Sequence, residues 1–186
     1  MTFKKIVFGL VTAIGMSSAL AWPDKPVSLV VPFPPGGSTD LIARTLAPKL
    51  QERLGGSFII ENKAGATGTI GAGIVTRAAP DGHTLLIHHI GMATMPALIR
   101  KPSFDVLNDF DYLGMIHEVP MTIVARPTLE ANDYKQLSAW VSSQKDKVNL
   151  GNAGIGSASH LCGLLWQSSM RTQMTTINYK GVSMAM

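Results

Sequence analysis

The chain has 186 residues, of which 46% are hydrophobic, and a formal net charge of +4. This charge is small and no run of lysines and arginines accompanies it, so composition argues against a nucleic-acid partner. Cys162 is the only cysteine, which excludes an intramolecular disulfide bond. Because leucines flank it, we expect Cys162 to pack in the core rather than to act as a nucleophile.

The first 21 residues have the pattern of a secretory signal peptide. Lys4 and Lys5 form a basic start, residues 6–13 are mostly apolar, and Ala19-Leu20-Ala21 is an A-x-A cleavage signal. The apolar run is too short to span a membrane, and no later segment is long and apolar enough. We therefore expect cleavage after Ala21 and an exported product; the alternative is a buried N-terminal helix.

Residues 27–31 form a short apolar run typical of a strand buried on both faces. Residues 32–37 follow with three prolines and two glycines, which prevent strand or helix from continuing. Ser38 or Thr39 can cap the next helix, and Asp40 falls in its first turn. A loop that leads into a helix N-terminus leaves backbone N–H groups free, which suits an anion such as a carboxylate.

The next segments alternate between helix and strand. Leucine and isoleucine at four-residue spacing from Ile42 to Leu54 predict an amphipathic helix, with a kink at Pro48. Residues 57–62 predict a strand, 62–69 a second glycine-rich loop, 70–79 a helix, 84–88 a strand and 92–99 a short helix. This order is typical of parallel βαβ units.

The rest of the chain continues the alternation. After a polar stretch, residues 110–126 are almost continuously extended and long enough to cross between two lobes. Residues 133–143 predict a helix, 148–152 a strand, 151–159 a third glycine-rich loop before another helix, and 175–179 a strand. Residues 181–186 start a helix without completing it. We expect a first α/β lobe over residues 22–120, a second, incomplete lobe over residues 121–186, and a sequence truncated at its C-terminus.

Enzyme and metal-site patterns are weak. Ser157 lies three residues before His160, but no acid is placed to orient the histidine and the G-x-S-x-G motif is absent. His88 and His89 would point to opposite faces of a strand, which disfavours a metal site. No Walker lysine follows a glycine-rich loop. We expect neither metal nor cofactor.

Five motifs in order along the chain resemble the Bug family, the periplasmic solute receptors of tripartite tricarboxylate transporters. They are residues 30–40, 61–72, 79–86, 152–161 and 178–181. The resemblance implies a type II periplasmic-binding-protein fold, in which two α/β lobes with mainly parallel sheets hold a small carboxylate and deliver it to a membrane permease. We expect a monomer.

Glycine-rich loops at the carboxyl ends of parallel strands are where open α/β sheets bind ligands. Asp40 has an alternative role as a complement to the helix dipole, Ser157 and Ser159 as helix caps, and Tyr179 as a packing residue. Alternatives to the receptor function are a secreted α/β hydrolase that uses Ser157 and a truncated fragment without function. By resemblance, the ligand-binding residues are Phe33, Pro35, Gly36, Gly37, Ser38, Asp40, Ala66, Thr67, Gly156, Ser157, Ser159 and Tyr179.

Overall fold

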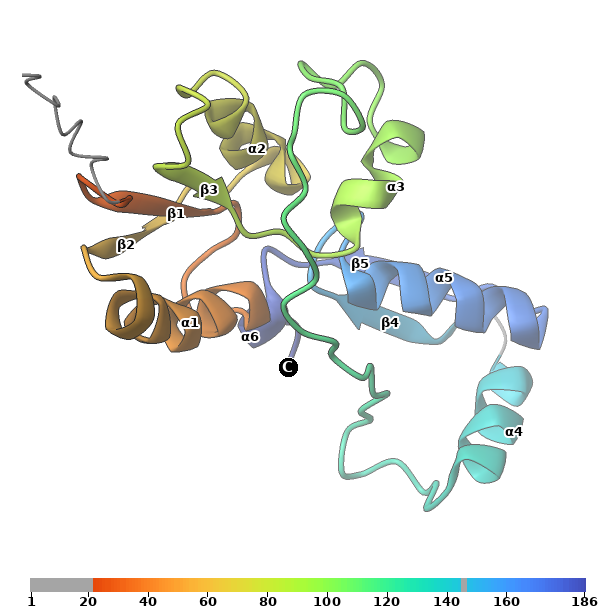
Figure 1. Cartoon of the computed structure of the whole chain (residues 1–186). Helices are drawn as coiled ribbons and strands as arrows, with labels where there is room; N and C mark the ends of the chain where they lie inside the picture. Colours follow the sequence, from red (N-terminus) through yellow and green to blue (C-terminus); the bar gives the residue numbers. More distant parts are fainter. Residues whose placement is uncertain (1–21, 145–146) are drawn as a thin grey trace, which may run out of the picture.

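The computed structural model describes residues 22–144 and 147–186, so the predicted signal peptide lies outside the described residues. The described part consists of two α/β units with a long extended segment between them (Figure 1). Its helices include none that is long and apolar enough to span a membrane.

The first unit is built on a three-stranded parallel sheet of order β2-β1-β3. Helix α1 lies on one face of this sheet and α2 on the other (Figure 1). The alternation of strand and helix confirms the βαβ organisation predicted from the sequence. In chain order the elements are β1 (Val27–Val31), α1 (Ser38–Leu54), β2 (Phe58–Asn62), the 3-10 turn η1 (Ala66–Gly68), α2 (Thr69–Val75), β3 (Thr84–Leu86) and α3 (Gly91–Leu98).

The central strand β1 is buried on both faces, as its apolar run predicted. Val27, Leu29 and Val31 pack against α1, while Val30 is also almost fully buried. A second cluster forms around α2 and α3, with Ala72 and Met95 at its centre. This double covering explains why β1 has no polar alternation along its sequence.

The buried face of α1 includes part of the predicted leucine stripe. Ala43 and Ala47 are buried at its centre, Leu46 and Leu50 are partly buried against the same cluster, and Leu54 is 45% exposed. Small side chains at the contact let the helix lie close to the sheet, which leaves the larger residues at the edges of the interface. The helix is continuous through Pro48.

The second unit has a two-stranded parallel sheet made of β4 and β5. A small cluster centred on Val141, Val148 and Met174 holds it to the neighbouring helices. Its elements are α4 (Tyr134–Gln144), β4 (Asn149–Asn152), α5 (Ala158–Met170), β5 (Thr175–Asn178) and α6 (Val182–Ala185). The predicted order of elements is confirmed here too.

Cys162 is exposed, which contradicts the prediction of a core cysteine. Helix α5 faces the sheet through Gly163, where an added Cβ would lie 2.9 Å from Leu150 Cδ2, and through Trp166 and Met170 of the buried cluster. These residues are spaced as one face of a helix. Cys162 lies outside that face.

Residues 110–126 are extended but form neither helix nor strand. Their large apolar side chains are exposed, with Leu113 at 83% and Val124 at 76%. An extended segment becomes a strand only when its backbone groups pair with a neighbour, and this segment joins neither of the two sheets. The predicted lobe boundary at residue 120 falls inside it.

Candidate functional site

The first glycine-rich loop connects β1 to α1. Phe33 is half-buried, and its ring stacks on that of His89 with the centroids 4.3 Å apart. Pro35, Gly36 and Ser38 are exposed. Gly37, rather than Ser38 or Thr39, is the N-cap of α1, and no side chain caps this end by a hydrogen bond.

Asp40 takes over part of the capping function from inside the helix. Its carboxylate is almost fully buried and accepts hydrogen bonds of 2.9 Å from the Gly36 N–H, Arg44 Nε and Asn62 Nδ2. The hydrogen bond from Arg44 is the main cause that lowers the pKa of Asp40 to about 2, against desolvation, which acts to raise the pKa. The carboxylate therefore fixes the first loop in place. Because the Gly36 N–H donates to Asp40, it is not free to bind a ligand.

The second loop has an unusual backbone. Ala66 and Thr67 have φ angles of +44° and +59°, which are left-handed values that residues other than glycine adopt at a cost. Gly68 follows with φ +93° and is buried. An added Cβ at Gly68 would lie 2.7 Å from His88 Nε2 and 3.3 Å from Phe33 Cζ. The second loop therefore lies directly against the first loop and against the end of β3.

The third loop connects β4 to α5 in the second unit. The Ser157 hydroxyl is the N-cap of α5, because it accepts the His160 N–H at 3.1 Å, and it also lies 3.1 Å from Ser159 Oγ. Ser159 Oγ accepts the Ala153 N–H at 3.0 Å. The helix-cap role considered for both serines is therefore present for Ser157 alone, while Ser159 holds the third loop through Ala153.

This geometry does not favour the hydrolase alternative. His160 Nδ1 accepts the Gly156 N–H at 3.2 Å, so this ring nitrogen is not directed at Ser157 as a general base would be. Within the described residues, no group of three or more His, Cys, Asp or Glu residues is placed to hold a metal ion.

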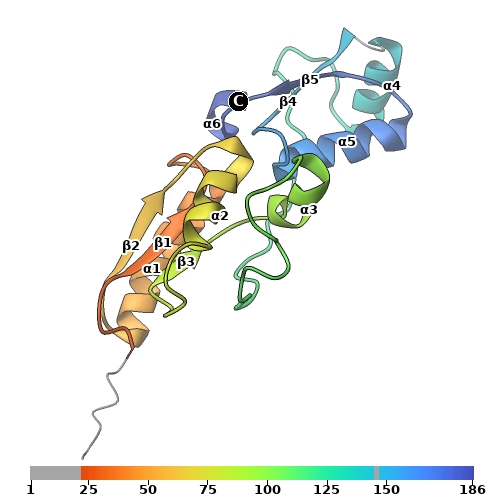
Figure 2. The same cartoon turned by 90° about the horizontal axis from the view of Figure 1, so that it is seen from above.

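The second and third loops meet between the two units. Gly156 is buried with φ +75°, and an added Cβ there would lie 2.9 Å from Thr67 Cγ2 and 3.2 Å from Leu98 Cδ1. The Gly156 carbonyl oxygen would lie 2.7 Å from a Cβ added to Gly91, at the start of α3. Figure 2 shows α3 beside the start of α5, in line with these contacts. The structure thus brings together Phe33, Thr67 and Gly156 of the predicted residues.

Tyr179 directly follows β5 and belongs to the second unit. Its ring lies 3.3 Å from the position of an added Cβ on Gly151, and its carbonyl oxygen 3.1 Å from one on Gly154. Asn152 holds the same loop, because its side chain accepts the Gly154 N–H and donates to Asn178 Oδ1, both at 2.8 Å. Tyr179 is therefore next to the third loop, as its position after a parallel strand predicts.

The sequence analysis missed the two histidines at the end of β3. His88 and His89 do not point to opposite faces of a strand, because β3 ends at Leu86. Their ring centroids lie 5.1 Å apart, and both rings contact Phe33. Desolvation by burial lowers the pKa of both rings, that of His89 to about 4. The sequence did contain a signal for them, because both histidines follow a predicted strand of the parallel sheet, at the edge where ligands bind.

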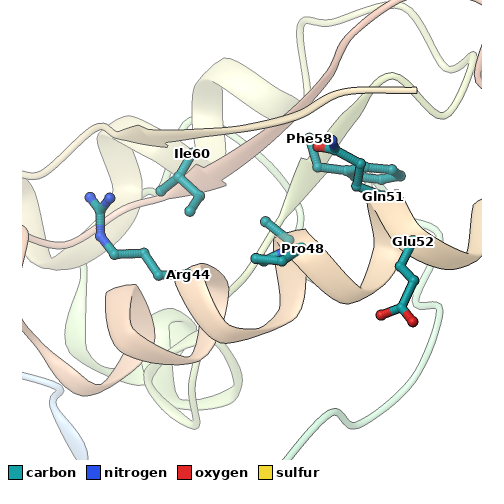
Figure 3. Close-up of a pocket in the computed structure, with 7 residues that line it drawn as sticks. Arg44, Pro48, Gln51, Glu52, Phe58 and Ile60 are labelled. Carbon is teal, nitrogen blue, oxygen red and sulfur yellow. The ribbon is translucent and has the colours of Figure 1, made fainter. Parts of the chain in front are cut away.

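A separate groove of about 640 Å³ lies between α1 and the edge strand β2 (Figure 3). None of its lining residues belongs to the predicted site. They are Arg44, Ala47, Pro48, Gln51, Glu52, Phe58 and Ile60.

Two parallel α/β units whose strand-end loops meet form the architecture of a periplasmic binding protein. Solved structures agree. The chain is 44% identical to the periplasmic binding protein BugD, over 88% of this chain and 55% of that one, with a TM-score of 0.81. Rpa4515 of R. palustris, solved with adipate, is 32% identical over 86% and 54% of the chains, TM-score 0.81. MatC of Rhodopseudomonas palustris, solved with malate, is 35% identical over 86% and 55%, TM-score 0.77.

Residues 42–186 match the tripartite tricarboxylate transporter family receptor, TctC. The chain therefore belongs to this family, and the resemblance to the Bug proteins is confirmed. The chain spans about half the length of the curated relatives that it matches.

Proposed function

We propose that this protein is a periplasmic receptor that binds a small organic carboxylate between its two lobes and delivers it to the permease of a tripartite tricarboxylate transporter. The contact of Gly156 with Thr67 and Gly91 carries the proposal, because it joins strand-end loops of both units at one place. Of the predicted ligand-binding residues, Phe33, Thr67 and Gly156 have the strongest support. The lobes are residues 22–120 and 121–186.

The chemistry of these loops suits a carboxylate. Left-handed backbone at Ala66 and Thr67 turns successive peptide groups, so that their N–H groups can converge on one anion, while the Gly68 N–H donates to the Gly65 carbonyl oxygen at 2.9 Å. Such groups bind an anion without a formal positive charge, and water can bridge the remaining distance. The MatC structure has malate bound and the Rpa4515 structure was solved with adipate, so a dicarboxylate is the ligand class that similarity favours.

A receptor releases its ligand unchanged, and we propose no catalytic step. The hydroxyl of Ser157 caps α5. This role is compatible with a binding protein and gives no sign of an activated nucleophile. Asp40 has a positioning role in this proposal, because its three hydrogen bonds hold the first loop against α1.

Isothermal titration calorimetry of the full chain tests the proposal, with malate, succinate, adipate and citrate as probes. We expect at least one of them to bind and to be recovered unchanged after incubation. Binding to none of the four, or turnover that Ser157→Ala abolishes, would overturn the proposed function. Glu52→Gln, in the groove away from the loops, is the matched control and should bind as the wild type does.

A further inference from the structure

One nitrogen of His88 stands out among the polar atoms around the loops. His88 Nε2 is buried and forms no hydrogen bond with the described residues. It lies against Gly68, 2.7 Å from the position of an added Cβ, with Phe33 beside it. Leaving a buried polar atom without a partner is costly, so such atoms in a native fold call for an explanation.

The other nitrogen of the ring determines what Nε2 can offer. His88 Nδ1 lies 2.9 Å from both the N–H and the carbonyl oxygen of His89. If Nδ1 accepts the His89 N–H, the neutral ring carries its proton on Nε2, and if the ring is charged, Nε2 is protonated as well. If Nδ1–H instead donates to the His89 carbonyl oxygen, the neutral ring leaves Nε2 as an acceptor. We assign the first arrangement, in which Nε2–H is a donor. Burial lowers the pKa of His88, which favours a neutral ring.

His89 has a different part in the same cluster. Its Nδ1 accepts the Gly91 N–H at 2.9 Å, and its ring stacks on Phe33. These contacts use His89 to hold the start of α3. Of the two histidines, His88 is therefore the one with an unused nitrogen. This nitrogen lies against Gly68 of the second loop, the loop whose Thr67 meets Gly156 of the other unit.

The cover over this donor is a strained segment. Gly68 lies directly against His88 Nε2, and the two residues before it, Ala66 and Thr67, have left-handed φ angles. Non-glycine residues adopt such conformations only at a cost in free energy.

We propose that His88 is a specificity-determining residue of the inter-lobe site, whose Nε2–H donates a hydrogen bond to a ligand carboxylate when the segment of residues 65–68 moves aside. This inference rests on the proposed function and adds one side-chain donor to the backbone groups of the loops. A hydrogen bond from a neutral donor to a carboxylate is charge-assisted, so it favours a carboxylate over an uncharged oxygen ligand of the same shape.

The experiment compares His88→Phe and His88→Gln with the wild type by calorimetry, using the probe among malate, succinate, adipate and citrate that binds most tightly. Phenylalanine keeps the ring beside Phe33 and removes both nitrogens, while the glutamine amide keeps a donor near the Nε2 position. His83→Gln is the matched control, because His83 is a buried histidine at the opposite end of β3, where its Nε2 lies 2.9 Å from Asp24 Oδ1 and its Nδ1 3.3 Å from Asp81 Oδ1. Circular dichroism gives the folded fraction of each variant.

We expect His88→Phe to weaken binding about tenfold to a hundredfold, the loss typical of a hydrogen bond to a charged group. His88→Gln should recover most of this loss, and His83→Gln should bind as the wild type does. In ¹H–¹⁵N spectra of the wild type, ligand should shift the His88 Nε2 resonance, which a purely structural role would leave in place. Equal affinity of His88→Phe and the wild type, with no such shift, would overturn the inference alone. A wild type that binds none of the probes would refute the proposed function, and this inference with it.

Discussion

The carboxylate of Asp40 offers a direct test of how the first loop is held. In Asp40→Asn the amide keeps the size of the side chain but loses the charge. Its NH₂ group must then face at least one of the three donors that now point at the carboxylate. Losing hydrogen bonds to a buried charge and leaving donors without partners should lower the free energy of unfolding at pH 7 by about 2–4 kcal/mol.

The pH dependence of this loss follows from the pKa. The folded-state pKa of Asp40 is about 2 against an ordinary value of 3.8, mainly because of the hydrogen bond from Arg44. A lowered carboxyl pKa contributes stability that is fully present above the unfolded value of 3.8 and is lost as pH falls through the folded value. A difference of nearly two pKa units corresponds to about 2 kcal/mol.

Urea unfolding followed by circular dichroism at pH 7, 5, 4, 3 and 2 measures both effects. Other carboxylates also titrate in this range, so the informative quantity is the difference between wild type and Asp40→Asn at each pH. We expect this difference to be constant from pH 7 to pH 5 and to shrink by about 2 kcal/mol by pH 2. Glu52→Gln, which removes an exposed ion pair with Lys49, is the control and should cost less than about 1 kcal/mol. A pH-independent difference, or one below about 0.5 kcal/mol at pH 7, would refute the reasoning.

Two further predictions concern the close packing of the loops and the surface of α5. Gly68→Ala should destabilise the protein by about 1–3 kcal/mol more than Gly55→Ala in urea unfolding. Both positions have positive φ, but a Cβ meets His88 and Phe33 only at Gly68 and open space at Gly55. Equal costs at the two positions would contradict the packing described here. Cys162 should react with a thiol reagent such as DTNB in the folded protein without denaturant, since it is exposed. Reaction only after unfolding would show that the thiol is buried and would contradict this prediction.

Several features of the fold could be predicted from the sequence because local chemistry determines them. Three prolines and two glycines after an apolar run end β1 whatever surrounds it. The strand-end position of the glycine-rich loops also follows from the order of elements, since parallel strands place their carboxyl ends at one edge.

Other features were wrong or invisible at that level because they depend on neighbours. The most buried residues of α1 are Ala43 and Ala47, which lie between helix and sheet, while Leu46 and Leu50 of the predicted stripe are only partly buried and Leu54 is exposed. Cys162 has the leucine neighbours of a core residue, yet α5 presents Gly163 to β4. Residues 110–126 have the composition of a strand, but strand formation needs a partner backbone.

By itself, the sequence determined the kinds of element, their order, the places where the chain turns and the family to which the chain belongs. The tertiary structure decided which backbone donors are already used, as with Gly36 and Asp40, and which side chains lie beside the loops, as with His88. The physical reason is distance. Turn and helix signals act over a few residues of chain, whereas a hydrogen bond or a contact between loops depends on groups that only folding brings together.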